Sequence, residues 1–444
     1  MIARISANDA VLLATDRGPA PMHLGAVVVL ERGSELGVDT VAGIIGERIQ
    51  HMPRLTQVLR RAPLGGGRAF WVDQPDFDID DHLSFQTLCV AGSDNSADDS
   101  GLLTEAARLL ATPLRRDRPL WAARWLTGLP DGDAALVVVL HHVLADGLGG
   151  LAVLAGLTDS QHSDGGLTRP PHLPPPRRVD LVREAWGSRL AALPEAAAWV
   201  RRLGGGAREL GVGAQRPRAA PATSLNRRTG PRRRLTATSV DLSQVVPAAH
   251  RVGGTVNDVV LAAATGAMTE FLAIRGEHPG DLVVSVPVSA RRTDAHGDLG
   301  NEVGVRPLRV PTMSDPRERL RRIVALTADQ PKAGRGSSAV PLGLVFRGLA
   351  AAGVFQRFVD HQRLVNTFLT NVHGPSRVLH FAGRPIREIL PMGQVSGNIG
   401  VAFAVLSYAG QLAVTVLVDP DIIDDADQRL LTTMLRRTFD ELVG

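Results

Sequence analysis

The chain has 444 residues, of which 44% are hydrophobic and 21% charged, so its length suits two folded domains of roughly 200 residues each. Its single cysteine, Cys89, excludes an internal disulfide framework and a metal site made of several cysteines. The formal net charge is only +4, and such a small excess is weak evidence for an anionic partner.

The N-terminal segment carries no signal-peptide pattern. Met1–Asp16 lacks a basic start followed by an apolar core. No apolar run approaches the roughly 18 residues that span a bilayer. We therefore expect a protein that is soluble or peripheral to a membrane, in a reducing compartment.

The first part of the chain is predicted to alternate helices and strands. Ser6 or Asn8 is a candidate N-cap for the first helix. The acidic stretch Trp71–Asp81 is interpreted as a solvated edge, because its carboxylates follow no metal-ligand spacing. Helices are expected at Ile5–Thr15, Val41–Met52 and Leu102–Leu110, and a turn followed by a strand at Pro19–Leu30.

The stretch Ala134–Gly150 is the most informative part of the sequence. Its unbroken apolar run, Val137–Leu140, predicts a buried strand that ends in His141 and His142. Adjacent residues on a strand face opposite sides, so one ring can enter a cleft while the other faces the core. The simpler alternative is a pair of core histidines beside a tight turn, but the complete HHxxxDG string favours a functional site.

The composition changes after the histidine strand. Residues 160–236 are predicted to form an interdomain crossover rich in Gly, Pro and Ser, between domains at 1–159 and 237–444. Its helical stretch, Val179–Leu203, carries Val182, Trp186 and Leu190 at helical spacing and either lies on a membrane surface or packs along the domain junction.

The last part of the chain again predicts helices and strands. Thr255 or Asn257 is expected to cap the first of these helices. Helices are expected at Gly253–Met268, Pro316–Gln330 and Asp424–Leu442, strands at Leu282–Arg292 and Phe368–Pro375, and a hairpin of strands at Gly397–Gly410 and Leu412–Asp419.

The segment His141–Gly147, HHVLADG, matches the HHxxxDG motif of the CoA-dependent acyltransferase superfamily. Nearly end to end, the chain resembles the bacterial wax ester synthase/diacylglycerol acyltransferase family. Further matching elements are Ser6 with Asp9, Pro21–Gly25, Pro119–Trp121, Ser224–Asn226, Asn257 with Asp258, Leu299–Gly304 and Phe368–Pro375. In the last element Thr370 and His373 replace a Ser and a Pro of the family, and we expect His373 to loosen that turn.

The resemblance implies an α/β fold of two chloramphenicol-acetyltransferase-like domains, each of mixed sheet and helices, with the active site in a channel between them. It also implies that His142 is the general base and that His141 is structural or supports it. Asp146 is expected to form a structural ion pair with an arginine, for which Arg291 is the matching candidate, and Gly147 to permit the turn.

The base is needed because an alcohol at neutral pH is a poor nucleophile towards a thioester. Asn257 is either an oxyanion donor or substrate-positioning group, or only a helix cap. Candidates for the substrate channel are Pro21, His23, Trp121 and Asn371, although core packing is preferred for His23 and Trp121. We expect no metal, because neighbouring strand histidines diverge and no third histidine lies near in sequence.

The expected activity is transfer of a fatty acyl group from coenzyme A to diacylglycerol or a long-chain alcohol, forming triacylglycerol or wax ester. Acyl-CoA is then a co-substrate and no other cofactor or nucleic-acid partner is expected. The expected location is cytoplasmic, at the inner face of the membrane or on lipid droplets. Acyl transfer to a polyketide- or sterol-type alcohol and a non-catalytic lipid-binding paralogue stay open as alternatives, and the oligomeric state is not predicted.

Overall fold

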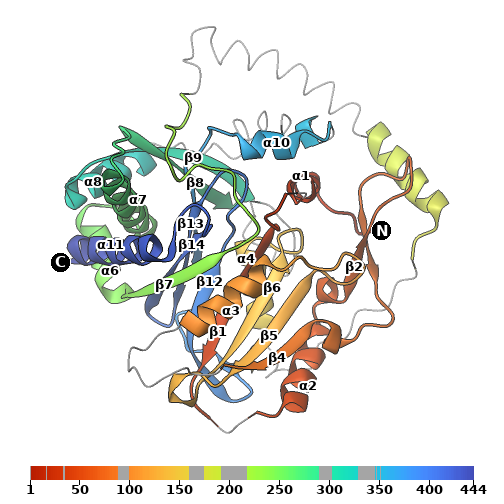
Figure 1. Cartoon of the computed structure of the whole chain (residues 1–444). Helices are drawn as coiled ribbons and strands as arrows, with labels where there is room; N and C mark the ends of the chain where they lie inside the picture. The colour runs from red at the N-terminus through yellow and green to blue at the C-terminus, as the bar shows by residue number, and fades with distance from the viewer. Residues whose placement is uncertain are drawn as a thin grey trace.

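The computed structural model describes residues 2–16, 18–33, 36–88, 100–159, 175–191, 218–289, 303–328, 346, 348–350 and 352–444. Two six-stranded sheets lie side by side, and α6, α7, α8 and α11 gather on the outer side of the second one (Figure 1). This mixed architecture confirms the predicted α/β fold. Arg291 and residues 192–203, with Pro194 among them, lie outside the described residues.

The first sheet combines strands from both ends of the chain. Its order is β11 (His380–Phe381), β12 (Arg384–Met392), β1 (His23–Leu30), β6 (Ala134–His141), β5 (Trp121–Thr127) and β4 (Leu83–Thr87). β1 pairs antiparallel with β6 on one side and with β12 on the other. The linear pattern does not predict this exchange, because β12 comes from the part of the chain expected to form the second domain.

The second sheet is built from the remaining long strands. Its order is β7 (Arg234–Asp241), β14 (Gln411–Val418), β13 (Val401–Tyr408), β10 (Thr367–His373), β8 (Asp281–Ser289) and β9 (Val303–Pro311). β13 and β14 pair antiparallel, which confirms the predicted hairpin, and β10 runs parallel to β13 and β8. A small separate sheet pairs β2 (Gln57–Arg60) with β3 (Phe70–Asp73).

Helices connect and cover the sheets. The α-helices are α1 (Ala7–Thr15), α2 (Val38–Ile49), α3 (Ser100–Ala111), α4 (Gly147–Gly156), α6 (Leu242–Arg251), α7 (Val256–Ile274), α8 (Pro316–Ala328), α10 (Phe355–Asp360) and α11 (Asp425–Val443), with short 3-10 turns at Pro53–Leu55, Ile79–Asp81 and Pro130–Gly132. Residues 178–191 are also helical. Ser6 caps α1 through a reciprocal pair of hydrogen bonds with Asp9, so Ser6 and not Asn8 is the N-cap.

One apolar cluster packs part of the space between the two sheets. Val27 and Val137 of the first sheet meet Ala402, Ala404 and Ala413 of the second in this cluster. Such short side chains allow the sheets to approach closely, so the faces of β1 and β6 that look towards the second sheet are fixed by packing. The site described below lies at one end of this junction.

Helix α7 differs in length from its prediction. It continues past Met268 to Ile274 and reaches 19 residues, so by length and composition alone it is apolar enough to cross a membrane. However, 72% of its most apolar window is buried inside the protein, and Val260, Ala264 and Leu272 belong to the core of the second sheet. Its hydrophobicity is therefore explained by burial among α6, α8 and α11.

Candidate active site

A cavity of about 230 Å³ opens between the two sheets beside the end of β6. Its walls come from β1, β6 and α4 on one side, and from β8, β10, β13 and residues 391–394 on the other. Most of the lining is aliphatic, and the larger polar side chains among the described lining residues are His142, Ser285, Thr370 and Gln394. A concave, mainly apolar pocket with few polar groups is the usual form of a small-molecule site.

A backbone hydrogen bond fixes the position of His142, which directly follows the end of β6. Its N–H donates to the carbonyl oxygen of Met22 at 2.8 Å, one residue before β1 begins, and its side chain lines the cavity. Burial lowers the pKa of His142, while the carboxylate of Asp146 acts in the opposite direction. The imidazole is therefore neutral at pH 7 and able to accept a proton.

His141 has a different environment on the other face of the strand. It is 1% exposed, and its Nδ1 accepts the backbone N–H of Val143 at 3.0 Å. The proton of the neutral ring must then sit on Nε2, which lies 3.2 Å from Oδ2 of Asp16. Burial, with the charge of Arg116 adding to it, lowers the pKa of His141 to about 3. This ring is a fixed hydrogen-bonding element and not the base.

Asp16 connects His141 to three other parts of the fold. It follows α1 directly, its Oδ1 accepts the N–H of Met22 at 2.8 Å, and its Oδ2 also pairs with Arg116. The carboxylate therefore holds the end of α1, the start of β1 and the end of β6 together. Asp16 was not predicted as a site residue, because nothing in its local pattern shows that it lies beside residue 141.

Asp146 is the N-cap of α4. Its Oδ1 accepts the N–H of Gly149 at 2.8 Å, and the residue is 1% exposed. The predicted ion pair with Arg291 stays a prediction, because Arg291 lies outside the described residues. Gly147 has a different role from the predicted one: its φ is not positive, but a β-carbon there would lie 3.0 Å from Cγ2 of Val372. Glycine thus lets α4 approach β10 closely.

Two of the predicted candidates meet at the start of α7. Nδ2 of Asn371 lies 3.4 Å from Oδ1 of Asn257, at the long end of the range for a hydrogen bond. Asn257 is not the helix cap, because Thr255 occupies the N-cap and pairs with Asp258. Neither asparagine is among the described residues that line the cavity, so their approach shows proximity to the site but no contact with it.

The other channel candidates also lie outside the described cavity lining. His23 is 2% exposed, its Nδ1 pairs with the carbonyl of Leu110 at 2.9 Å, and burial lowers its pKa to about 4. Trp121 is buried, and its Nε1 donates to the carbonyl of Leu55 at 2.8 Å. Both positions agree with the preferred interpretation as core residues. Pro21 precedes Met22 and contributes no described lining atom.

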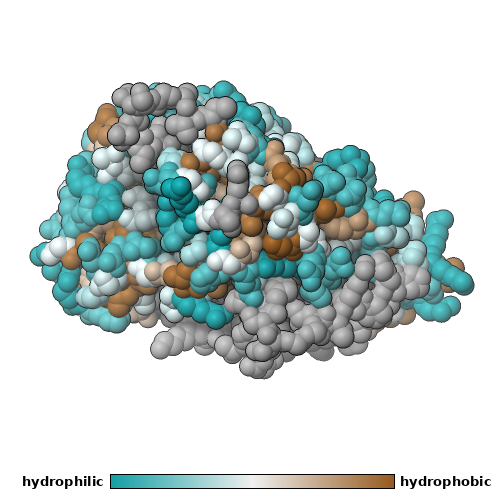
Figure 2. All heavy atoms as spheres, turned by 90° about the horizontal axis from the view of Figure 1, so that it is seen from below, coloured by the Kyte–Doolittle hydropathy of each residue, from teal (hydrophilic) through white to brown (hydrophobic). Residues whose placement is uncertain are grey.

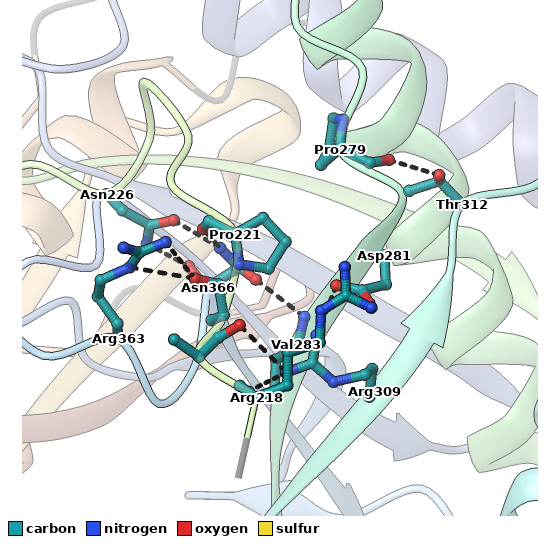
Figure 3. A network of polar contacts seen from close by, with 12 residues as sticks. Arg218, Pro221, Asn226, Pro279, Asp281, Val283, Arg309, Thr312, Arg363 and Asn366 are labelled. Atoms are coloured by element: carbon teal, nitrogen blue, oxygen red, sulfur yellow. Dashed lines mark hydrogen bonds and ion pairs between the residues drawn. The ribbon is translucent and has the colours of Figure 1, made fainter. Parts of the chain in front are cut away.

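The Ser224–Asn226 element lies near the end of the predicted crossover, where hydrogen bonds fix the chain against β8 and β10. Asn366 lies at the centre of the contacts in Figure 3: its Nδ2 donates to the carbonyl of Pro221 and to Oδ1 of Asn226, each at 2.8 Å, and its Oδ1 accepts the N–H of Val283 at 2.9 Å. These contacts position β8 and β10, which carry Ser285 and Thr370 into the cavity wall.

Ser285 and Gln394 were not predicted as site residues. Gln394 lines the cavity, and its Oε1 is buried with no hydrogen-bond partner among the described residues. Gln394 follows β12, whose exchange into the first sheet brings it to the site. His373 of the altered turn is exposed, and its Nδ1 lies 3.0 Å from the hydroxyl of Ser407.

Comparison with known proteins covers almost the whole chain. Residues 5–260 match the model of the wax ester synthase/diacylglycerol acyltransferase catalytic domain, and residues 299–442 match the C-terminal domain of the same family. A probable diacylglycerol O-acyltransferase of Mycobacterium tuberculosis and a putative one of Mycobacterium bovis are each 32% identical, over 92% of this chain and 88% of theirs.

Solved structures show the same fold. The wax ester synthase/diacylglycerol acyltransferase of Marinobacter aquaeolei superposes with a TM-score of 0.69 at 22% identity, covering 99% of this chain and 98% of that one. The first condensation domain of the calcium-dependent antibiotic synthetase gives a TM-score of 0.63 at 18% identity, covering 100% and 96%. Together with the two matched family domains, these likenesses show that the chain belongs to the wax ester synthase/diacylglycerol acyltransferase family.

Proposed function

We propose that this O-acyltransferase moves a fatty acyl group from coenzyme A to diacylglycerol or a long-chain alcohol, giving triacylglycerol or wax ester, with His142 as general base. The observation that carries the proposal is the position of His142 in the wall of an aliphatic cavity between the two sheets, where burial lowers the pKa of the imidazole. The relatives named above as diacylglycerol O-acyltransferases support the substrate class.

The chemistry follows from the properties of this ring. Neutral His142 takes the proton of the acceptor hydroxyl while the oxygen of that hydroxyl attacks the thioester carbonyl. The resulting imidazolium then returns a proton to the departing CoA thiolate. The hydroxyls of Ser285 and Thr370 and the amide of Gln394 are the polar groups available in the described wall to orient the reacting groups. Acyl-CoA is a co-substrate in this scheme, and no step requires a metal or another cofactor.

The direct test is release of free CoA from acyl-CoA in the presence of a panel of acceptors. Diacylglycerol and long-chain alcohols are expected to support release, with the matching ester as product and no loss of rate after lasting treatment with a chelator. A faster reaction with polyketide- or sterol-type alcohols identifies a different acceptor class. No release with any acceptor, from a protein that still binds lipid, identifies a non-catalytic paralogue.

We further propose that residues 178–191 dock the enzyme reversibly on an anionic lipid surface at the cytoplasmic side of a membrane or on lipid droplets. Leu181 and Ala185 pack this helix onto the first part of the chain, where the guanidinium of Arg4 donates to the carbonyl of Leu181 at 2.9 Å. The opposite side leaves Trp186 54% exposed and Leu190 60% exposed. Such a face with arginines around it suits shallow interfacial binding.

Exposed large hydrophobic side chains lie closer together on this helix than on the rest of the described surface. The face of the molecule in Figure 2 shows hydrophobic residues in several separate patches between hydrophilic ones, which is ordinary for a folded protein. The helix instead presents Val179, Trp186 and Leu190 within 12 positions, with Arg178, Arg183 and Arg189 exposed beside them. The guanidinium of Arg189 lies 5.4 Å from the ring of Trp186.

A flotation assay with anionic vesicles at low and high salt tests the docking. Trp186→Ser is expected to weaken binding several-fold while turnover of a soluble short-chain alcohol and the melting temperature stay close to the original. Leu430→Ser, at a residue of α11 that is 37% exposed, is the matched control and should leave flotation unchanged. Equal flotation of the two variants would show that the helix does not dock.

A further inference from the structure

A second and smaller apolar chamber lies behind α4. It measures about 20 Å³ and is enclosed between α4, the first sheet and the β11–β12 segment; Val28, Leu136, Leu157, Leu379, Phe381 and Ile386 are among its walls. Leu151 and Leu154 line this chamber and also line the cavity that contains His142. The two leucines are three residues apart on α4, so they stand next to each other on one helix face.

We propose that Leu151 and Leu154 form a partition that ends the alkyl-chain site beginning at His142, and that they thereby set the longest unbranched chain the enzyme accepts. The inference rests on the proposed function, because it assigns the occupant of the apolar cavity as the hydrocarbon tail of a substrate. The small chamber is then a closed extension of the same site.

The volumes explain why the partition acts as a limit. A space of about 20 Å³ admits little more than one water-sized sphere, and a chamber with apolar walls does not hold a water stably. Thr158 is a polar residue in the wall, but its hydroxyl already donates to the carbonyl of Ala155 at 2.7 Å. The chamber therefore offers nothing to a polar head group and room to a hydrocarbon only if a leucine is shortened.

The far end of the chamber is closed more firmly than the partition. The guanidinium of Arg48 lies 5.1 Å from the ring centroid of Phe381 and pairs with Asp159 at 2.5 Å. The carboxylate of Asp159 in turn accepts the N–H groups of Ala382 and Gly383, at 2.9 and 2.8 Å, in the turn between β11 and β12. This ion pair and its hydrogen bonds fix the end wall, whereas the partition consists, among the described residues, of two aliphatic side chains.

Shortening either leucine to alanine should therefore join the two spaces. Replacing a buried leucine by alanine leaves a cavity that the surroundings fill only in part. Each further methylene that enters an apolar space improves binding roughly fourfold. We expect Leu154→Ala and Leu151→Ala to move the chain-length optimum to longer substrates, and Leu154→Phe to move it to shorter ones.

The experiment measures kcat/KM for saturated acyl-CoA substrates of increasing length with one short alcohol, and then for alcohols of increasing length with one acyl-CoA. The arm whose optimum shifts identifies which tail reaches the partition. Leu148→Ala is the matched control, since it changes the same residue type on α4 at a position that is 39% exposed. A profile that stays unchanged in both arms for Leu151→Ala and Leu154→Ala overturns the inference.

A binding measurement separates failure of this inference from failure of the proposed function. Bound cis-parinaric acid is displaced with saturated fatty acids of increasing length, which requires no turnover. If the protein transfers no acyl group but Leu154→Ala still extends the preferred fatty acid length, the partition stands and the activity is wrong. If transfer proceeds and neither length profile changes, the partition is wrong and the activity stands.

Discussion

His141 and His142 are neighbours in sequence but differ in their contacts and in their access to the cavity. His141 is 1% exposed, its two ring nitrogens face the N–H of Val143 and the carboxylate of Asp16, and its pKa is lowered to about 3. His142 lines an aliphatic cavity between two sheets. Alternation along the strand end separates the two rings, because successive side chains point to opposite faces.

The difference indicates that His141 holds the backbone in place and that His142 is the ring available to react. The contacts of His141 tie the end of β6 to Asp16 and so to the start of β1, where the carbonyl of Met22 also receives the N–H of His142. The backbone that carries His142 is thus fixed on both sides, while its ring remains directed to the cavity. A catalytic base needs this combination of a rigid support and access to the substrate.

The largest expected effect comes from His142→Ala. Loss of a positioned base should lower the rate of CoA release by roughly 10²–10⁴-fold, while the melting temperature changes little because the ring borders a cavity. Purified variant and original protein are compared by steady-state kinetics and thermal melts. A folded variant that retains more than about a tenth of the original rate would show that His142 is not the base.

Asp16→Asn tests the supporting histidine. The new amide would point an N–H at Nε2 of His141 or force its proton to Nδ1, where it would oppose the N–H of Val143. We expect roughly a tenfold loss of kcat with a smaller change in KM, and a loss of about 1–3 kcal/mol in the free energy of unfolding. Kinetics and urea unfolding measure both effects.

The matched control for Asp16→Asn is Asp117→Asn. Asp117 makes the same kind of arginine pair with Arg115, but on the surface, where such pairs contribute little. Adding Arg116→Gln to Asp16→Asn should cost less than the sum of the two single losses, because both residues act through one contact. Additive losses in kcat would show that Arg116 does not act through Asp16 and His141.

Much of this arrangement is already evident from local sequence. The apolar run before His141 predicts β6, whose eight residues are all buried, and one of the two predicted candidates, Ser6, is the N-cap of α1. The resemblance carried by HHxxxDG predicts a two-domain fold with a channel between the domains. The strand and the helix cap depend on short-range periodicity and capping chemistry, which a linear pattern records directly, whereas the two-domain fold is implied only by the resemblance.

Features that depend on distant contacts were not predicted. Asp16 lies 125 residues from His141, and β12 enters the first sheet from the far end of the chain and brings Gln394 to the cavity. Gly147 was expected to serve a turn, but its value lies in the approach of Val372 from another sheet. Single-residue patterns contain no information on such pairs, because tertiary packing decides them.

Two substitutions at Asp146 separate its cap from its charge. Asp146→Asn keeps an N-capping group for α4, whereas Asp146→Ala removes it and should cost about 0.5–2 kcal/mol of stability. Both remove the negative charge that raises the pKa of His142, so the acid limb of kcat/KM should move to lower pH in both. Measured pH profiles that match the original enzyme would show that the carboxylate acts only as a cap.

The smallest expected effect concerns His23, which packs with its ring centroid 5.9 Å from that of His141. Burial lowers the folded-state pKa of His23 to about 4, from an ordinary value of about 6.5, so between these values the unfolded chain binds a proton that the folded protein does not. The free energy of unfolding must therefore fall as pH decreases through this window, by up to about 1.4 kcal/mol per pH unit for one group.

His23→Gln should flatten that slope in urea unfolding measured from about pH 7 to about pH 4.5, although the variant is less stable at neutral pH. His380→Gln changes an exposed histidine and should leave the slope as it is. An unchanged slope in His23→Gln would show that the acid sensitivity comes from other buried histidines, such as His141 and His82, whose pKa values burial also lowers.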